Sequence, residues 1–375
     1  MSEWREVSLG SLLKLITKGT TPPKGKGFVE HGINYIKSDA INYNSRIDVT
    51  KFVAIDKGTH HKFKRSQLEE LDILFSMAGA YLGKNGIVLK YMLPANTNQA
   101  LAILRVNQDL ALPYYISQFL GQSSMVDYIN NMSGQSAQPN INFQEISSIE
   151  INLPPLPEQK AITEVLSSLD DKIDLLHRQN KTLEQMAETL FRQWFVEEAG
   201  EDWGETTLGG VINISSGKGL KKEKLIDNGK YPVLGANGEI GRTNDFLFDR
   251  RLLYTGRVGT LGNVFRVENK KVWLSDNTLV IKPNKFYNFI YFLLKNAKLE
   301  QYNVGSTQPL IRQSDIKEIE VLIPEESQLI LFEKESDLLF GKINKNQKQI
   351  RTLESLRDTL LPKLMSGEVR IASNG

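Results

Sequence analysis

Four histidines, His31, His60, His61 and His177, are the first residues to examine for catalysis or metal binding. They do not stand in the H-E-x-x-H spacing or in another metal-ligand spacing, and His177 lies on the charged face of an expected helix. The chain has no cysteine, which excludes thiolate metal ligands and disulfides. We therefore expect no catalytic residue and no metal site.

Two glycine-rich stretches, SGKGLKK at 216–222 and GANGEIG at 235–241, come nearest to a nucleotide-binding loop. Neither has the order of strand, loop and helix that a phosphate-binding fingerprint requires, and the G-x-S-x-G elbow of hydrolases does not occur. The segment NLPPL at 152–156 is similar to the Asn-Pro-Pro-aromatic motif of adenine methyltransferases, but Leu153 interrupts it and the aromatic residue is missing. We expect no cofactor site here and interpret the prolines as a stiff hinge.

Basic residues alternate with small hydroxyl and amide side chains in several segments that contain turn-forming Gly and Pro. Lys and Arg attract phosphates and can hydrogen-bond guanine, whereas Asn and Gln can pair with adenine in the major groove. One such loop is more often simply solvated, but together they favour a nucleic-acid ligand. The candidates are Lys18, Thr20, Thr21, Lys24, Lys26, Lys37, Ser38 and Asn42 in the first half of the chain, and Lys218, Lys221, Lys222, Asn237, Arg242 and Arg257 in the second.

The charge of the chain is unevenly distributed. The formal net charge is +2, yet residues 157–198 hold nine acidic and five basic side chains, and residues 325–361 hold seven and six. The remaining residues carry a net charge of +7, which suits a polyanionic partner. The longest apolar runs are far shorter than the roughly 20 residues that cross a bilayer, so we expect no membrane span and a cytoplasmic protein.

Two short phrases, GQSAQPNI at 134–141 and GSTQPLI at 305–311, indicate an internal repeat. Their offset of 170 residues holds through ISSIEI and IKEIEV, which begin at 146 and 316, and through TLE at 182 and 352. Upstream the offset drifts from 199, between Trp4 and Trp203, to about 178, between NQALAIL and DNTLVIK. We interpret the chain as two copies of one unit, the first of which has extra loop residues.

Each copy contains two parts with different patterns. Short β-branched and aromatic runs, such as DILFSMAG at 72–79 and RLLYTG at 251–256, predict a twisted, largely antiparallel sheet. Helical patterns at 113–131 and 284–302 make the fold class α+β. The predicted mixed domains span 1–152 and 201–323, and the predicted helical regions span 153–200 and 324–375.

Both helical regions carry a heptad pattern. The first begins at Pro157, whose missing N–H costs nothing in the first turn, and each continues for about 40 residues. An isolated helix would leave its apolar stripe exposed to water, so we expect the two helices to pair. The expected seam comprises Ile162, Leu166, Leu169, Ile173, Leu176, Asn180, Leu183 and Leu190 in the first helix and Phe332, Leu339, Ile343, Asn346, Ile350, Leu353 and Leu360 in the second.

Connectivity sets the direction of this pair. At ~1.5 Å per residue the first helix carries the chain ~60 Å from the first mixed domain to the second, and the second helix must return along it. We therefore predict an antiparallel coiled-coil rod crossed by a pseudo-twofold axis. Asn180 and Asn346 either fix the register of the seam or lie at its solvent-exposed edge, and the sequence leaves both interpretations open.

The two repeated phrases close the mixed domains directly before the strand and hinge that lead into each long helix. Their polar side chains either face nucleic acid or tie the loop internally, and both interpretations remain open. These residues are Ser136 and Gln138 in the first copy and Ser306, Thr307 and Gln308 in the second.

The plan of the whole chain resembles the specificity subunit of type I restriction-modification systems. The central helical region of that family is similar to LPPLPEQKAITEVLSSLDDKIDLLHRQNKTLEQMAETLFRQWF from residue 153, and its distal region to LESLRDTLLPKLMSGEVRI from residue 353. The phrases GxxxQPxI and GSTQPxI resemble the ends of its target-recognition domains. The second hinge departs from the family pattern, because PEESQ stands where LPEQ is expected.

The resemblance implies that each mixed domain recognises one half of a split DNA target. The rod would set the spacer between the halves and dock the methyltransferase subunits; since one turn of B-DNA is ~34 Å, domains ~60 Å apart would reach grooves one to two turns apart. The implied partners are double-stranded DNA, two methyltransferase subunits and two ATP-driven restriction and translocase subunits. S-adenosylmethionine, ATP and Mg²⁺ would belong to those subunits, and this chain would catalyse nothing.

Two other hypotheses stand beside DNA recognition. A non-catalytic coiled-coil scaffold whose two heads bind proteins would show no salt-dependent affinity for DNA. An independent enzyme would need a catalytic set of residues, which the sequence does not contain.

Overall fold

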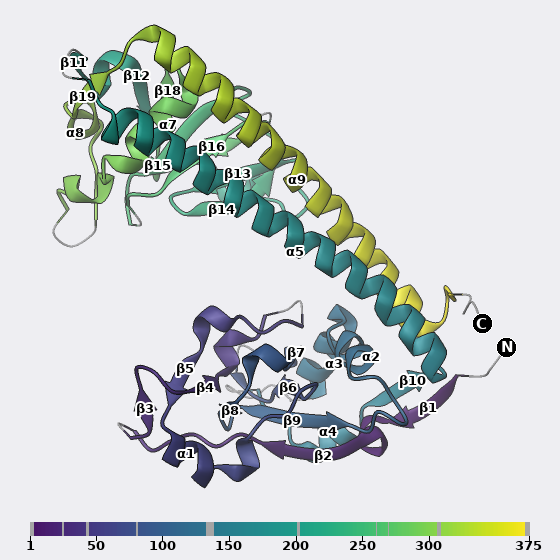
Figure 1. The fold of residues 1–375 in the computed structure, drawn as a ribbon. Helices are drawn as coiled ribbons and strands as arrows, with labels where there is room; N and C mark the ends of the chain where they lie inside the picture. Colours follow the sequence, from purple (N-terminus) through teal and green to yellow (C-terminus); the bar gives the residue numbers. More distant parts are fainter. Residues whose placement is uncertain are drawn as a thin grey trace. The chain divides into compact units, whose positions relative to one another are not determined.

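The computed structural model describes residues 4–24, 26–42, 45–79, 82–132, 139–200, 203–259, 261–268, 270–305 and 309–371 (Figure 1). The chain divides into two compact units, one formed by Met1–Asp174 with Ile350–Gly375 and the other by Leu175–Gln349. Each unit therefore combines a mixed domain with a segment of both long helices. Among the described helices, none is long and apolar enough to cross a membrane.

The mixed domain of the first unit contains two sheets. The larger is antiparallel with the order β2-β9-β6-β7, and its strands in that order are Leu13–Lys18, Leu101–Val106, Ile73–Ser76 and Asn85–Ile87. The smaller has the order β3-β5-β4-β8, with strands Phe28–Val29, Val53–Ile55, Ile33–Ile36 and Ala95–Thr97, and its β4 and β8 run parallel. A separate antiparallel ribbon joins β1, Arg5–Ser8, to β10, Glu150–Leu153.

The second unit repeats this topology. Its larger sheet has the order β12-β18-β15-β16, with strands Ile212–Ser216, Thr278–Pro283, Leu252–Gly256 and Val264–Val267. Its smaller sheet, β14-β13-β17, contains Gly238–Thr243, Tyr231–Gly235 and Trp273–Leu274, and β13 pairs with β17 in parallel. The ribbon is formed by β11, Gly204–Thr207, and β19, Glu320–Ile323. The largely antiparallel pairing agrees with the prediction, but each mixed domain has two sheets and a ribbon, and its smaller sheet includes one parallel pair.

The two copies differ most in one connection of the smaller sheet. β4 ends at Ile36 and β5 begins only at Val53, whereas β13 ends at Gly235 and β14 begins at Gly238. A backbone φ of +112° at Gly238 allows this tight turn, because a residue without Cβ adopts positive φ at little cost. The first copy carries part of its extra loop residues here and part in the next connection, since β5 ends at Ile55 and β6 begins at Ile73, whereas β14 ends at Thr243 and β15 begins at Leu252.

The helices of the mixed domains lie where the pattern placed them, but each predicted helix is divided. The segment at 113–131 forms α2, Pro113–Leu120, and α3, Ser123–Met132, with the break at Gly121. The segment at 284–302 forms α7, Tyr287–Asn296, and a 3₁₀ turn, Leu299–Tyr302, separated by Lys298 in the left-handed region. The short helices are α1, Lys57–Lys62, α4, Phe143–Ser147, α6, Leu208–Val211, and α8, Gln313–Lys317.

The two long helices are α5, Leu156–Arg192, which continues as a π-helical turn, Gln193–Glu197, and α9, Glu326–Ser366. They run antiparallel in each unit. In the first unit the Arg357 guanidinium lies 3.1 Å from the Asp170 carboxylate, and in the second Asn346 Nδ2 donates to Asn180 Oδ1 at 2.9 Å. Since Asn346 is 1% exposed, this contact supports the interpretation that the asparagines fix the register of the seam.

Each member of the predicted seam is buried or half-buried. The heptad pattern missed several aromatic residues that pack against the seam of the second unit. Phe191 contacts Phe292 with a ring-centroid distance of 5.4 Å, and Phe195 contacts Phe332 at 5.0 Å. These rings join the helix pair to the mixed domain, so they lie beside the narrow helix–helix stripe that heptad spacing identifies.

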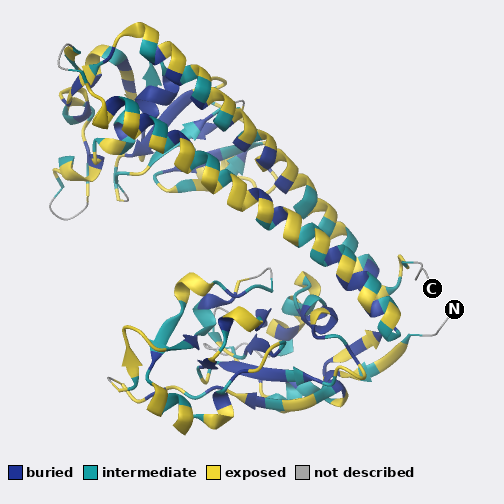
Figure 2. Cartoon of the chain, viewed as in Figure 1, coloured by how far each residue is buried: buried dark blue, intermediate teal, exposed yellow. Residues whose placement is uncertain are grey.

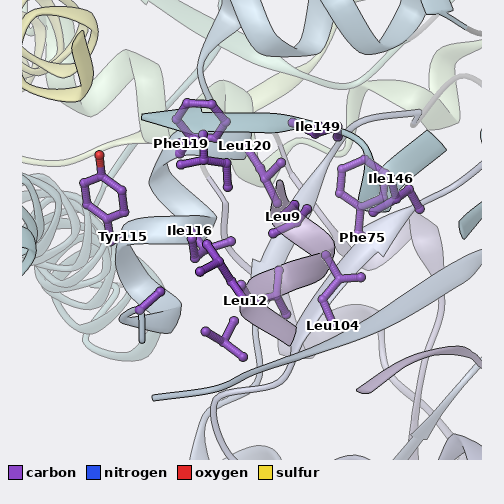
Figure 3. Close-up of a cluster of buried hydrophobic side chains, with 14 of the residues drawn as sticks. Leu9, Leu12, Phe75, Leu104, Tyr115, Ile116, Phe119, Leu120, Ile146 and Ile149 are labelled. Atoms are coloured by element: carbon purple, nitrogen blue, oxygen red, sulfur yellow. The ribbon is translucent and has the colours of Figure 1, made fainter. Parts of the chain in front are cut away.

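Each mixed domain has its own apolar core between the sheets and the helices (Figure 2). In the first unit α2 and α4 pack into the same core as the larger sheet, and Figure 3 shows Ile146 of α4 beside Phe75 of β6 and Ile116 of α2 near Leu12. Burying one such side chain stabilises the fold by about 1.5–3 kcal/mol. The core therefore holds the strand ends, and the loops that follow them, in fixed positions.

Candidate nucleic-acid interface

In the first unit, several of the polar loops lie together at one end of the strands of the larger sheet. β2 and β6 end there and β9 begins there, because Lys18 pairs with Ala102 and Ser76 pairs with Leu101. The smaller sheet contributes the end of β4, since the Asn98 N–H donates to the Ile36 carbonyl at 3.3 Å. We call residues 18–24, 37–42, 77–79, 98–100 and 139–141 the loop edge of the first unit.

The second unit has the same arrangement. β12 and β15 end where β18 begins, because Ser216 pairs with Leu279 and Gly256 pairs with Thr278. The Ser275 N–H donates to the Leu234 carbonyl at 2.9 Å, which brings the β13–β14 turn to the same edge. The loop edge of the second unit comprises residues 217–224, 236–237, 257–259, 275–277 and 309–311.

The prolines of the two repeated phrases lie at these edges. The Gly79 N–H donates to the Pro139 carbonyl, and the Gly259 N–H donates to the Pro309 carbonyl, both at 3.0 Å. The repeat therefore marks equivalent places in space. The five polar candidates of the phrases, Ser136, Gln138, Ser306, Thr307 and Gln308, lie outside the described residues, and both interpretations of them stay predictions.

A glycine begins the basic loop at each edge. A Cβ at Gly19 would lie 2.1 Å from the Asn98 carbonyl oxygen, and a Cβ at Gly217 would lie 2.1 Å from that of Ser275. Both contacts are with backbone, which cannot move aside as a flexible side chain could. Only glycine lets the backbone pass this close to the turn before β9 or β18. We call Gly19 and Gly217 the crossing glycines.

An aromatic side chain from the smaller sheet holds the residue after each of these glycines. Tyr35 Oη donates to the Thr20 carbonyl at 2.9 Å, and Trp273 Nε1 donates to the Lys218 carbonyl at 2.7 Å. Burial raises the pKa of the Tyr35 phenol, so the hydroxyl remains a neutral donor at ordinary pH. The sequence predictions missed both aromatic residues, because they lie far in sequence from the loops that they hold.

The first basic loop combines exposed cations with hydroxyl groups that have partners. Lys18, Lys24 and Lys26 are exposed. Thr20 Oγ1 accepts a hydrogen bond from Arg65 at 3.3 Å, and Thr21 Oγ1 accepts one from the Gln99 N–H at 3.3 Å. Arg65 is an exposed cation that the sequence predictions did not include.

The segment after β4 supplies the remaining candidates of the first unit. Lys37 and Ser38 are half-buried, and Asn42 is exposed. Asn42 Oδ1 accepts a hydrogen bond from the Arg46 N–H at 3.1 Å, which shapes the loop. These residues lie at the loop edge because β4 ends there.

Most second-unit candidates are also exposed at the loop edge. Lys218, Lys221 and Lys222 follow the crossing glycine, and Arg257 follows β15. Asn237 lies in the turn between β13 and β14, where its Oδ1 accepts from Asn263 at 3.5 Å.

Arg242 differs from the other second-unit candidates. Its guanidinium donates to the Gly229 carbonyl at 2.7 Å and to the Lys230 carbonyl at 3.2 Å, and it pairs with Glu239 at 2.9 Å. These contacts direct the side chain toward its own β-hairpin and the preceding loop.

In the part of the chain that the structure describes, no group of three or more His, Asp or Glu side chains is arranged to hold a metal ion. His60 Nδ1 forms a hydrogen bond with the buried Asn96 side chain, so it joins two elements of the first unit.

Comparison with known proteins gives matches along the whole chain. The model of the family described as type I restriction modification DNA specificity domain matches residues 1–185 and 200–351. The MjaIX specificity subunit of a type I restriction enzyme from Methanocaldococcus jannaschii is 28% identical over 322 residues, which cover 74% of each chain. The putative MjaX specificity subunit from the same organism is 24% identical over 417 residues, covering 98% of this chain and 94% of that one.

A solved structure has the same fold. The type I restriction-modification system S subunit from M. genitalium superposes with a TM-score of 0.62 at 20% identity, covering 97% of this chain and 96% of that one. The two ranges matched by the family model contain the two mixed domains, each with its own loop edge. The chain belongs to the family of type I restriction-modification DNA specificity proteins.

Proposed function

We propose that this chain selects the DNA target of a type I restriction-modification complex, with each loop edge contacting one half of a bipartite sequence. The observation that carries this proposal is the repetition of the loop edge, with its crossing glycine and exposed lysines, in both units. Lysines attract the phosphate backbone, and side chains of the neighbouring loops would then read base edges. Two connected sites of this kind suit a target with two specified halves and an unspecified spacer.

We further infer that the chain is a non-catalytic subunit. S-adenosylmethionine, ATP and Mg²⁺ would be bound by its partners, two methyltransferase subunits and two restriction and translocase subunits. The internal duplication supports this number, because two similar faces can bind two copies of the same partner. The paired segments of α5 and α9 are the surfaces that we assign to the methyltransferase subunits.

The test is selection of bound sequences from a random pool of double-stranded DNA by the chain assembled with its methyltransferase. We expect enrichment of a bipartite motif with a fixed spacer, and affinity that falls as salt is added. Failure to enrich a bipartite motif, or affinity independent of salt, would favour the scaffold whose heads bind proteins.

Charge-removal variants locate the interface. Lys18→Ala or Lys218→Ala should reduce the slope of log affinity against log salt by about one unit, because each variant removes one phosphate contact. Lys14→Ala is the control, since this exposed lysine lies near the start of β2, at the end of the strand opposite the loop edge. An equal effect of all three substitutions would contradict the proposed location.

A further inference from the structure

The same anchoring contact occurs at both loop edges, although the two anchors are different amino acids. Tyr35 Oη donates to the carbonyl of Thr20, and Trp273 Nε1 donates to the carbonyl of Lys218. In each case the accepting residue directly follows the crossing glycine. The anchors come from different strands of the smaller sheet, because Tyr35 lies in β4 and Trp273 lies in β17, the counterpart of β8. What the two units share is the held carbonyl, which indicates that its position matters.

The backbone N–H of the same residue is also held. The Thr20 N–H donates to the Thr97 carbonyl at 2.9 Å, and the Lys218 N–H donates to the Leu274 carbonyl at 2.8 Å. Each anchored residue therefore has both of its backbone polar groups fixed by the smaller sheet. This fixes the direction in which the basic loop leaves the sheet and the place from which its lysines project.

We propose that Tyr35 and Trp273 are positioning residues for DNA recognition, each of which holds the basic loop of its own unit in the orientation that contacts one half-site. This inference rests on the proposed function. A loop that is ordered before binding loses little conformational freedom when DNA binds, whereas a released loop must be ordered by the DNA. The anchors therefore act on affinity through the lysine loops, without themselves touching DNA.

The first unit offers a closely matched control. Tyr35 and Tyr115 are both 0% exposed, and the hydroxyl of each donates to one backbone carbonyl. Tyr115 bonds to Asn152 at 3.0 Å, in the ribbon strand β10. Replacing either tyrosine by phenylalanine removes one buried hydroxyl and one hydrogen bond, but only Tyr35→Phe releases the basic loop.

The second unit offers its own control. Tyr287 Oη donates to the Leu252 carbonyl at 3.0 Å, and Leu252 begins β15 at the end of the strand opposite the loop edge. Trp273→Phe removes the indole donor at the loop edge, and Tyr287→Phe removes a buried donor far from it. The two anchors are tested in separate variants. If one of these variants fails to fold, the variant of the other unit still tests the inference.

The experiment measures the affinity of the assembled complex for three duplexes: the selected target, the target with one half scrambled, and the target with the other half scrambled. Tyr35→Phe should weaken binding to the intact target by about 3- to 10-fold, as expected for the loss of one hydrogen bond. The ratio of the affinities for the intact and the scrambled duplex should fall at one half-site only. Trp273→Phe should act on the other half-site. Each control should lower the melting temperature by a similar amount and leave both discrimination ratios unchanged.

Three outcomes would overturn the inference. Unchanged half-site ratios in Tyr35→Phe and Trp273→Phe, with lower melting temperatures, would show that the anchors only stabilise the fold. A loss of affinity in Tyr115→Phe or Tyr287→Phe equal to that of the anchor variants would show a general effect of destabilisation. An unmodified complex that binds intact and scrambled duplexes equally would reject the proposed function and this inference together, and that measurement is made first.

Discussion

Glu333 of α9 provides a helix cap that the neighbouring helix lacks in its own sequence. α7 begins after Phe286, which has a φ of +52° and no side-chain hydrogen bond to the helix. The Phe289 N–H belongs to the first turn, where backbone donors have no partner within the helix. It donates to Glu333 Oε1 at 2.8 Å. One turn later on α9, Asp337 Oδ1 accepts from Asn288 Nδ2 at 2.7 Å. Glu333 therefore caps α7, and Asp337 binds the Asn288 side chain, so both carboxylates connect the mixed domain to the long helix.

This cap makes stability depend on pH in a defined direction. Burial raises the pKa of Glu333 above its ordinary value of 4.5, so the folded protein favours the protonated carboxyl. The stability gained in this way is full below about pH 4.5 and is lost as the pH rises through the raised pKa. Glu333→Gln keeps the accepting oxygen and removes the charge. Its melting temperature relative to the unmodified protein should therefore increase between about pH 4.5 and about pH 7, as measured by calorimetry.

Glu318→Gln is the control for this substitution, because it removes a carboxylate at an exposed position. It reports the effect of the change in net charge alone. A difference in melting temperature between Glu333→Gln and the unmodified protein that is constant with pH would contradict the assignment.

At the residue scale, the sequence indicated exposed cations within loops, but it did not indicate the side chains that reach from one element to another. Lys18 and Lys218 were identifiable because each follows a strand pattern and adjoins a glycine. Tyr35 and Trp273 looked like ordinary core aromatics, since the carbonyls that they hold lie in other elements. A hydrogen bond that depends on the packing of two sheets leaves no local pattern in the sequence.

The paired helices are the element whose pattern was most informative. Their apolar period required a partner, and connectivity required that the partner run antiparallel. The sequence could not decide whether Asn180 and Asn346 face each other, because that depends on register to within one residue. Their hydrogen bond of 2.9 Å now identifies the pair as the polar contact within an otherwise apolar part of the seam.

A double-mutant cycle tests this contact. Asn346→Leu should destabilise the protein by about 1–3 kcal/mol, because it leaves the Asn180 amide without its partner in a half-buried position. Asn180→Leu combined with Asn346→Leu should recover most of that loss, since both polar groups are then removed. The measurement is urea unfolding of the single and double variants. Strictly additive effects would show that the two asparagines do not depend on each other.

For the whole molecule, the repeat is the feature that sequence analysis established most firmly. The drift of the offset placed extra residues in the first copy, and they lie between β4 and β5 and between β5 and β6, where the second copy has shorter connections. The base preference of each loop edge could not be predicted, because it depends on side-chain positions to about an ångström. The division into two sheets was missed because short strands give the same pattern in parallel and antiparallel pairs.

The helix pair gives a prediction at this scale. Inserting one heptad into α5 and one into α9, both next to the Asn180–Asn346 pair, keeps the apolar period and adds ~10.5 Å of helix. If the helices set the spacer, the preferred DNA target should gain about 3 base pairs between its unchanged halves, at ~3.4 Å per base pair. Selection from a random pool measures the spacer directly.

A second variant inserts four residues, ~6 Å of helix, into α5 alone. It should also lengthen the spacer, and it should lower stability because the two apolar stripes no longer match. An unchanged spacer in the double-heptad variant would show that the length of the helices does not set the spacing of the two half-sites.

The positions of the four tryptophans determine what the intrinsic fluorescence of this protein reports. Trp4 donates to Glu158 at the start of α5, and Trp194 and Trp203 pack around Phe195 at its other end, so their emission follows the joints of the helices. Trp273 is alone among the four in standing at a loop edge, with its indole N–H bonded to the basic loop. The second unit therefore contains a natural optical probe of its own proposed half-site, whereas in the first unit the loop edge is anchored by a tyrosine and Trp4 reports on the start of α5 instead.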